Sequence, residues 1–121
     1  MQADATETLA RYIYSKNHYK ISDCTVKYAA FVPQKDNRRL SVFRISGLEE
    51  NKIWEIAKDL RAQPLLARAD IKATSVFEAS LAIERDDTPP GHANIVDWPE
   101  EDSDIKLKAM ALAERATLLM R

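Results

Sequence analysis

The feature that most constrains how this chain can fold is a polar segment late in the sequence, residues 86–99. It contains Pro89, Pro90 and Pro99. Proline fixes φ and has no N–H group, so it interrupts a helix and is excluded from the middle of a sheet. We therefore expect residues 86–99 to form a stiff loop between a strand and a helix. Loops of this length in compact domains are often functional.

The side chains of this loop suggest a catalytic group. An imidazole such as that of His92 titrates near neutral pH, and a carboxylate such as that of Asp97 can fix its tautomer and stabilise its cation. We name His92 and Asp97 as candidate catalytic residues, and Asn94 and Trp98 as candidate binding residues. The competing interpretation is that His92 only hydrogen-bonds to the backbone of a tight turn, because the loop offers no obvious nucleophile.

The same loop carries acidic side chains that suit a divalent cation. Asp86, Asp87, His92 and Asp97 are suitable ligands, but their spacing matches neither an EF-hand nor a zinc motif. The expectation is a solvated acidic loop with no bound metal. The chain has only two glycines, which excludes a glycine-rich phosphate-binding loop, and we predict no cofactor.

Charge is distributed unevenly along the chain. Residues 11–44 contain eight Lys and Arg against two Asp, a net charge of +6, whereas residues 84–104 contain one Arg against eight acidic residues, a net charge of −7. Such asymmetry indicates either a polyanion-binding face or two surfaces that attract one another, within or between molecules. Four basic residues are candidate phosphate contacts: Lys35, Arg38, Arg39 and Arg44. The competing interpretation is a solvated charged turn that protects an edge strand.

Hydrophobic periodicity predicts one α+β domain over residues 1–121. Apolar spacings of three and four predict helices over about 5–16, 49–62 and 105–119, with N-caps at Asp4 and at Asp102 or Ser103. Alternation predicts strands over about 24–32, 40–45 and 74–84, while 65–72 is undecided. The first two strands and the turn at 33–37 form an expected hairpin. The expected fold is a small antiparallel sheet, the hairpin plus at least one further strand, packed against about three helices.

The last helix carries more apolar surface than one stripe requires. Leu107, Met110, Leu118 and Met120 extend this surface, which favours an interaction element. The leading interpretation is therefore a small interaction or accessory protein, a homo-oligomer or the binder of a protein partner, with residues 86–99 and the last helix as contact surfaces. The alternative is a small hydrolase or transferase centred on His92 and Asp97. Nucleic-acid binding through the basic hairpin is the third interpretation.

Cysteine usage and hydropathy bear on the compartment. Cys24 is the only cysteine, so no disulfide can form within the chain and a reducing compartment is expected. No segment approaches the ~20 apolar residues of a membrane span, and the first residues do not resemble a secretory leader. The sequence therefore predicts a cytoplasmic protein without membrane contact.

Overall fold

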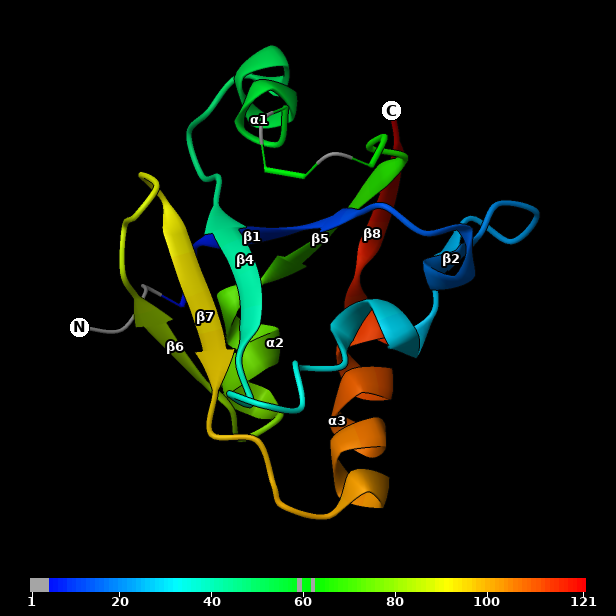
Figure 1. Cartoon of the computed structure of the whole chain (residues 1–121), viewed down its shortest axis with the longest axis vertical. Helices are drawn as coiled ribbons and strands as arrows, with labels where there is room; N and C mark the ends of the chain where they lie inside the picture. Colours follow the sequence, from blue (N-terminus) through cyan, green and yellow to red (C-terminus); the bar gives the residue numbers. More distant parts are fainter. Residues whose placement is uncertain (1–4, 59, 62) are drawn as a thin grey trace.

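The computed structural model describes residues 5–58, 60–61 and 63–121, and its centre is an antiparallel sheet of six strands (Figure 1). The strand order is β6-β7-β4-β1-β5-β8. The strands are β1 Thr8–Ile13, β4 Leu40–Arg44, β5 Ala67–Lys72, β6 Ala82–Arg85, β7 His92–Val96 and β8 Thr117–Met120. An antiparallel sheet with helices in separate parts of the chain is an α+β fold, so the predicted class is confirmed, although the sheet is larger than expected.

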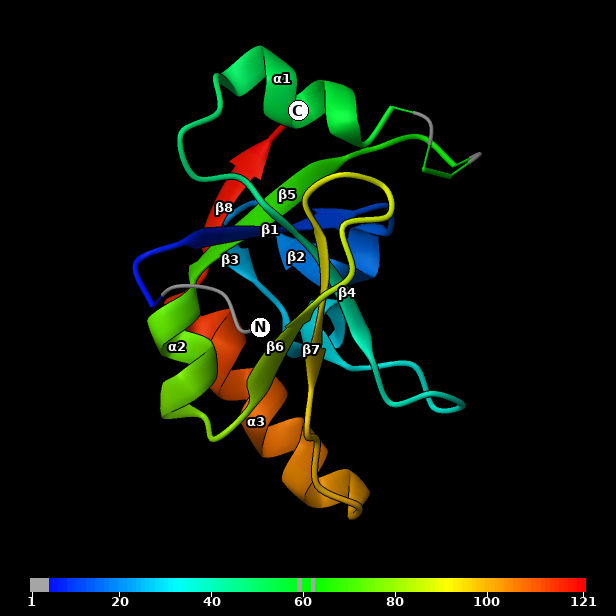
Figure 2. The ribbon, with the colours of Figure 1, turned by 90° about the vertical axis from the view of Figure 1, so that its left-hand side faces the viewer.

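Helices and short turns of helix pack around this sheet. Within the described residues they are α1 Glu50–Ile56, α2 Ala73–Glu78, α3 Asp102–Arg115, and the 3-10 helices η1 Lys16–His18 and η2 Tyr28–Phe31. A separate two-stranded ladder joins β2 Tyr19–Lys20 to β3 Thr25–Val26. Figures 1 and 2 place α1 at one end of the molecule and α2 and α3 toward the other. Among the described residues no helix is both long enough and apolar enough to cross a membrane.

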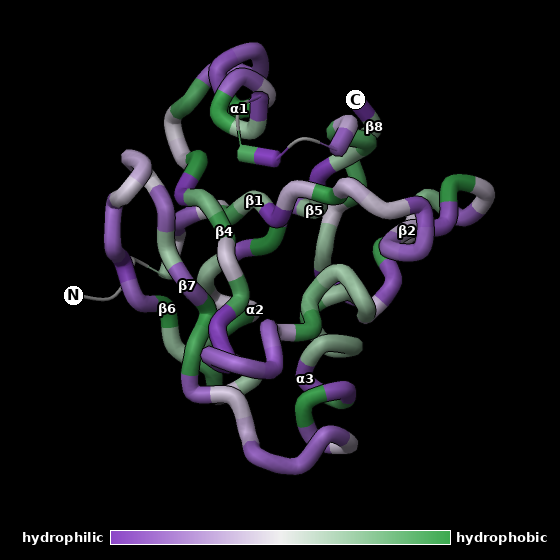
Figure 3. The backbone as a smooth tube through the Cα atoms, in the orientation of Figure 1, coloured by the Kyte–Doolittle hydropathy of each residue, from purple (hydrophilic) through white to green (hydrophobic). Residues whose placement is uncertain are grey.

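The two faces of the sheet contribute to two buried clusters, because successive side chains of a strand point to opposite faces. Leu9 and Val42 belong to the larger cluster, which also includes residues of α2, α3 and η2. Ala10 and Phe43 belong to the smaller cluster, which includes Ile53 of α1. Figure 3 shows hydrophobic stretches along these strands and a hydrophilic segment leading into α3. The face that carries α1 also holds polar side chains of β4 and β7, and these form the candidate site.

The predicted first helix, over 5–16, is wrong, because this segment forms the central strand β1 between β4 and β5. Leu9, Ala10, Tyr12 and Ile13 are all buried. A strand covered on both faces buries consecutive side chains, so the alternation that identifies a strand is lost. The remaining spacing of Leu9, Tyr12 and Ile13 then imitates a helix. Asp4, the expected cap, lies outside the described residues.

The predicted hairpin is wrong in its first strand. The strand over 40–45 is confirmed as β4, but residues 24–32 form β3 and the 3-10 helix η2. Ala30 and Phe31 of η2 are both buried, and the Arg11 Nε donates to the Ala30 carbonyl at 2.9 Å. Strand β4 pairs with β1 and β7 instead of with the segment before the turn at 33–37. The turn therefore connects η2 to the sheet.

Other predicted boundaries shift because helix and strand adjoin without a polar loop between them. The strand over 74–84 is wrong: α2 occupies its first half and β6 its second. The last helix ends at Arg115, β8 follows directly, and the undecided segment 65–72 contains β5. Helix α1 begins as predicted but is shorter than 49–62, of which residues 59 and 62 lie outside the described residues. The N-cap of α3 is Glu101 rather than Asp102 or Ser103.

The expected loop over 86–99 contains the strand β7, which pairs with β4 and β6. Its prolines lie on either side of this strand, where no ladder hydrogen bond is lost. Ala93 and Ile95, buried at alternate positions, are the strand signal within the segment. The prediction of a loop is therefore correct for 86–91 and wrong for 92–96.

Candidate functional site

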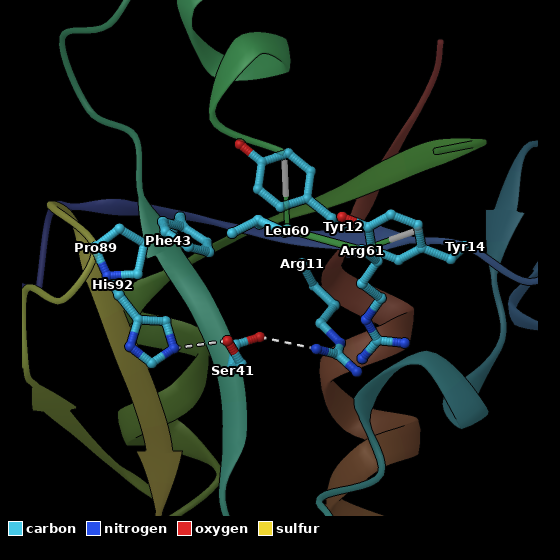
Figure 4. Close-up of a pocket in the computed structure, with 9 residues that line it drawn as sticks. All are labelled: Arg11, Tyr12, Tyr14, Ser41, Phe43, Leu60, Arg61, Pro89 and His92. Atoms are coloured by element: carbon cyan, nitrogen blue, oxygen red, sulfur yellow. Dashed lines mark hydrogen bonds between the residues drawn. The ribbon is translucent and has the colours of Figure 1, made fainter. Parts of the chain in front are cut away.

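His92, the first residue of β7, is at the centre of a hydrogen-bonded chain of three side chains. Its Nδ1 lies 2.6 Å from Asp86 Oδ1, and its Nε2 lies 2.7 Å from Ser41 Oγ. The imidazole is 15% exposed, so it is mostly shielded from water. Figure 4 shows the ring of His92 directed at the hydroxyl of Ser41, on the neighbouring strand β4. The three side chains form an Asp–His–Ser relay.

The register of the sheet creates this relay. Phe43 lies opposite His92 and Ser41 lies opposite Asn94, so Ser41 is the diagonal neighbour of His92 on the same face. The rings of Phe43 and His92 meet edge to face, with centroids 5.3 Å apart. This contact and the diagonal hydrogen bond hold the imidazole in one orientation.

The turn that precedes β7 supplies Asp86. The backbone N–H groups of Asp86 and Asp87 both donate to the His92 carbonyl, and the His92 N–H donates to the Pro89 carbonyl. The Thr88 N–H donates to the Asp86 Oδ1 at 3.0 Å. These local bonds fix the carboxylate relative to the imidazole, as expected of a short turn with polar side chains. The competing interpretation is that His92 serves only to stabilise a tight turn by hydrogen bonds. It is correct in part, because the backbone of His92 does stabilise this turn.

The protonation states of the relay follow from its partners. The Thr88 N–H and, to a smaller extent, His92 lower the pKa of the Asp86 carboxyl below its usual range. An ionised carboxylate only accepts hydrogen bonds, so the Nδ1 of His92 carries the proton. In the neutral imidazole Nε2 then holds a lone pair and accepts a hydrogen bond from the Ser41 hydroxyl. In hydrolytic enzymes, a histidine base that accepts a hydrogen bond from a hydroxyl in this way activates that hydroxyl as a nucleophile.

The Ser41 hydroxyl opens onto a cavity of about 180 Å³ where β1 and β4 diverge. These two segments are joined by a hydrogen bond from the Ile45 N–H to the Thr8 carbonyl, and then pair at Leu9 with Arg44 and at Ala10 with Phe43. Beyond that point the Arg11 side chain bridges the gap, and its Nη1 donates to the Ser41 carbonyl at 3.0 Å. The cavity is lined by Arg11, Tyr12, Tyr14, Ser41, Phe43, Leu60, Arg61, Pro89 and His92 (Figure 4).

The structure separates the predicted pair of catalytic residues. Asp97 is exposed and follows the far end of β7, and at ~3.3 Å per residue a strand carries it about 16 Å from His92. Asp86 holds the imidazole in its place. Asn94 belongs to the site, since its Nδ2 lies 3.5 Å from the Asp86 Oδ2. Trp98 is buried and donates to the Ile95 carbonyl, so it anchors the end of β7 in the core.

Sequence reasoning missed Ser41, Arg11 and Arg61. A serine between two apolar residues of a strand carries no local signal of activity. Its diagonal position next to His92 depends on a pairing between residues 51 positions apart in the chain. Asp86 had a local signal, because an aspartate six residues before a histidine across a Pro-Pro-Gly turn can fold back onto it.

The candidate phosphate contacts mostly have partners within the chain. The Arg39 guanidinium pairs with Glu84 at 2.9 Å, and Arg44 pairs with Glu7 and Asp87. The Arg38 guanidinium donates to the Pro99 carbonyl. Lys35 lines a separate groove beside α3. Two of these arginines therefore join the basic and acidic parts of the chain: Arg39 pairs with Glu84 of β6, and Arg44 pairs with Asp87 in the turn after β6.

The described residues contain no group of three or more His, Cys, Asp and Glu side chains placed to hold a metal ion. Asp86 and Asp87 point to different partners, His92 and Arg44 respectively.

No protein-family model, no curated protein sequence and no solved structure matches the chain.

Proposed function

We propose that the protein is a small serine-dependent hydrolase or acyl transferase in which Ser41 is the nucleophile. One observation supports this proposal: Asp86, His92 and Ser41 form a continuous hydrogen-bonded chain whose hydroxyl end lines a cavity. The same roles, an orienting carboxylate, a histidine base and a serine nucleophile, recur on unrelated folds and are recognised by geometry rather than by sequence order.

The chemistry follows from the positions of the atoms. Ser41 Oγ attacks the carbonyl carbon of an ester as its proton passes to His92 Nε2, and Asp86 stabilises the imidazolium. The alcohol leaves with that proton, and an acyl group stays on Ser41. Water, activated by His92, then releases the acid, so that ester and water become acid and alcohol. In a transferase a second alcohol takes the place of water.

Negative charge on the carbonyl oxygen needs a donor in the tetrahedral state. Successive residues of an antiparallel strand direct their N–H groups to opposite neighbours. Arg44 donates to Gly91 on the β7 side, so the N–H of Ser41, three residues earlier, points toward β1 and the cavity. The positive charge of Arg11, whose Nη1 contacts the Ser41 carbonyl, stabilises the developing oxyanion.

Covalent labelling tests this proposal directly. A fluorophosphonate should modify Ser41, located by mass spectrometry of the digested protein, and 4-nitrophenyl acetate should be hydrolysed. Ser41→Ala and His92→Gln should each lower the rate by at least about 10²-fold, the lower limit for loss of general-base catalysis. Ser103→Ala removes an exposed serine of α3 and is the matched control. An unlabelled Ser41, with no hydrolysis above the rate of the Ser41→Ala variant, would refute the proposal.

The interaction-protein interpretation remains a second proposal, supported by the surface of α3. Leu107 is 63% exposed and Met110, one turn away, is 47% exposed. The other two residues of the predicted apolar surface, Leu118 and Met120, do not belong to α3. Leu118 is buried, and Met120 lies on the edge strand β8. An edge strand with apolar neighbours is a common site of pairing between chains. Self-association would therefore use α3 and β8 and leave Ser41 accessible.

A further inference from the structure

The cavity beside Ser41 continues into a second hollow of about 120 Å³ around Arg11 and Arg61. The two hollows share Arg11, Tyr12, Tyr14 and Arg61, and the second adds Ser15, His18 and Gln63. No aspartate or glutamate is among the described residues that line either hollow. The space next to the hydroxyl is thus bounded by cationic, aromatic, neutral polar and aliphatic groups, the last from Leu60 and Pro89.

We infer that Arg11 and Arg61 form a subsite for a carboxylate on the acyl part of the substrate. That the bound carboxylate belongs to a substrate rests on the proposed function. The carboxylate site itself depends only on the positions of Arg11 and Arg61. The substrate class would be short esters whose acyl chain ends in a carboxylate, since the two hollows are small.

Arg11 is placed to bind such a group. Its Nε donates to the Ala30 carbonyl and one Nη1 hydrogen to the Ser41 carbonyl. A guanidinium has five N–H donors in a fixed fork, so three remain, two of them on Nη2. Burial, and then the charge of Arg61, lower the pKa of Arg11 to about 10, which leaves it charged at neutral pH.

Arg61 brings a second positive charge to the same place. Its guanidinium lies over the ring of Tyr14, 5.1 Å from the centroid, and Figure 4 shows it beside that of Arg11. Burial and the charges of both arginines also lower the pKa of His18, in the adjoining hollow. Like charges that lie side by side repel one another, and a bound anion lowers this cost. The forked donors of arginine match the two oxygens of a carboxylate.

Two other arginines that are shielded from water, Arg68 and Arg44, have counter-charges, whereas Arg38 donates to the carbonyls of Trp98 and Pro99. Arg68, 2% exposed, is held by Glu50 and Asp70 and lies over the ring of Trp54. Arg44 has Glu7 and Asp87. In the part of the chain that the structure describes, Arg11 has only carbonyl partners and Arg61 only the Tyr14 ring. The guanidinium of Arg11 is only partly exposed, and a cation in that position without a carboxylate partner suits a ligand that supplies one.

Two measurements test the subsite separately from the chemistry. In the first, kcat/KM is compared for 4-nitrophenyl acetate and for the monoester of succinate with 4-nitrophenol, which carries a free carboxylate. We expect kcat/KM to be about tenfold or more higher for the succinate ester, because one hydrogen bond between charged groups contributes a free energy of that size. Arg61→Gln should remove this preference, so that the ratio of the two kcat/KM values falls by about tenfold. Arg115→Gln, a substitution of the same type on α3, should keep it.

In the second measurement, succinate is titrated into the inactive Ser41→Ala variant and followed by NMR of the arginine Nε–H signals. Shifts at Arg11 and Arg61 that disappear in Ser41→Ala/Arg61→Gln support the subsite. If they occur while neither ester is hydrolysed, the subsite stands and the proposed function fails. Hydrolysis of the acetate ester without succinate binding, or with equal kcat/KM for both esters, overturns the subsite and leaves the proposed function in place. Arg61 is exposed, so its replacement does not endanger the fold.

Discussion

Replacement of His92 by alanine should destabilise the fold by about 2–3 kcal/mol, more than a single lost hydrogen bond would. The imidazole makes two side-chain hydrogen bonds, to Asp86 and to Ser41, and one edge contact with Phe43. Each hydrogen bond contributes about 1 kcal/mol net, and an aromatic pair adds about 0.5–1 kcal/mol. Ser41 and Asp86 both keep access to water after the substitution, so no further penalty for an unpaired buried group is added.

Urea unfolding followed by tryptophan fluorescence measures this change, since Trp54 and Trp98 lie in the folded core or against it. A loss of this size corresponds to a fall in Tm of about 10 °C for a domain of this length. Asp86→Ala and the double variant complete a thermodynamic cycle that isolates the His92–Asp86 bond. A loss below about 0.5 kcal/mol, within the range of ordinary surface substitutions, would refute the hydrogen-bonded relay in solution.

Other substitutions probe the remaining parts of the structure. Arg68→Ala removes the partner of Asp70 and of the exposed Glu50 and should cost about 1–3 kcal/mol in urea unfolding, mainly because Asp70 is left unpaired, whereas an unchanged midpoint would contradict the Arg68–Asp70 ion pair. Because the folded state lowers the pKa of Asp86, its contribution to stability is complete above about pH 4 and declines on further acidification, so Asp86→Asn should flatten the acid limb of a stability profile. Asp97 has φ 69°, and Asp97→Gly should raise stability by about 0.5–1 kcal/mol, while loss of esterase activity in that variant would return Asp97 to the site. Sedimentation at micromolar concentration should show an oligomer that Leu107→Glu with Met110→Glu dissociates, and a monomer at all concentrations would exclude association through α3.

The fold class could be predicted from the sequence, but the order of the strands could not. Helices α1 and α3 have the one-sided apolar patterns on which such predictions depend. Strand β1 is buried on both faces and therefore has no such pattern. In α2, Ala73 and Val76 are buried at helical spacing, but the segment runs directly into β6, and the combined pattern resembled one long strand.

The candidate site, like the strand order, could be predicted from the sequence only in part. His92 is identifiable because imidazole is a rare and reactive side chain, but a continuous loop over 86–99 predicts Asp97 as its partner. The strand β7 extends the backbone after His92, which carries Asp97 away, while the turn before it brings Asp86 back. Ser41 becomes part of the site only through the β4–β7 register, a pairing across distant parts of the sequence that local patterns do not encode.

The charge asymmetry and the proline-containing segment, two separate features of the sequence, act together in the structure. Arg39 pairs with Glu84 and Arg44 pairs with Asp87, on either side of Asp86 in the chain. Arg39, just before β4, thus holds the end of β6, and Arg44, the last residue of β4, holds the turn that follows, while Asp86 between these two points faces His92. Single exposed ion pairs contribute little to stability. Their value here is positional, because they fix the turn that carries Asp86 to the strand that carries Ser41, and so set the geometry of the whole relay.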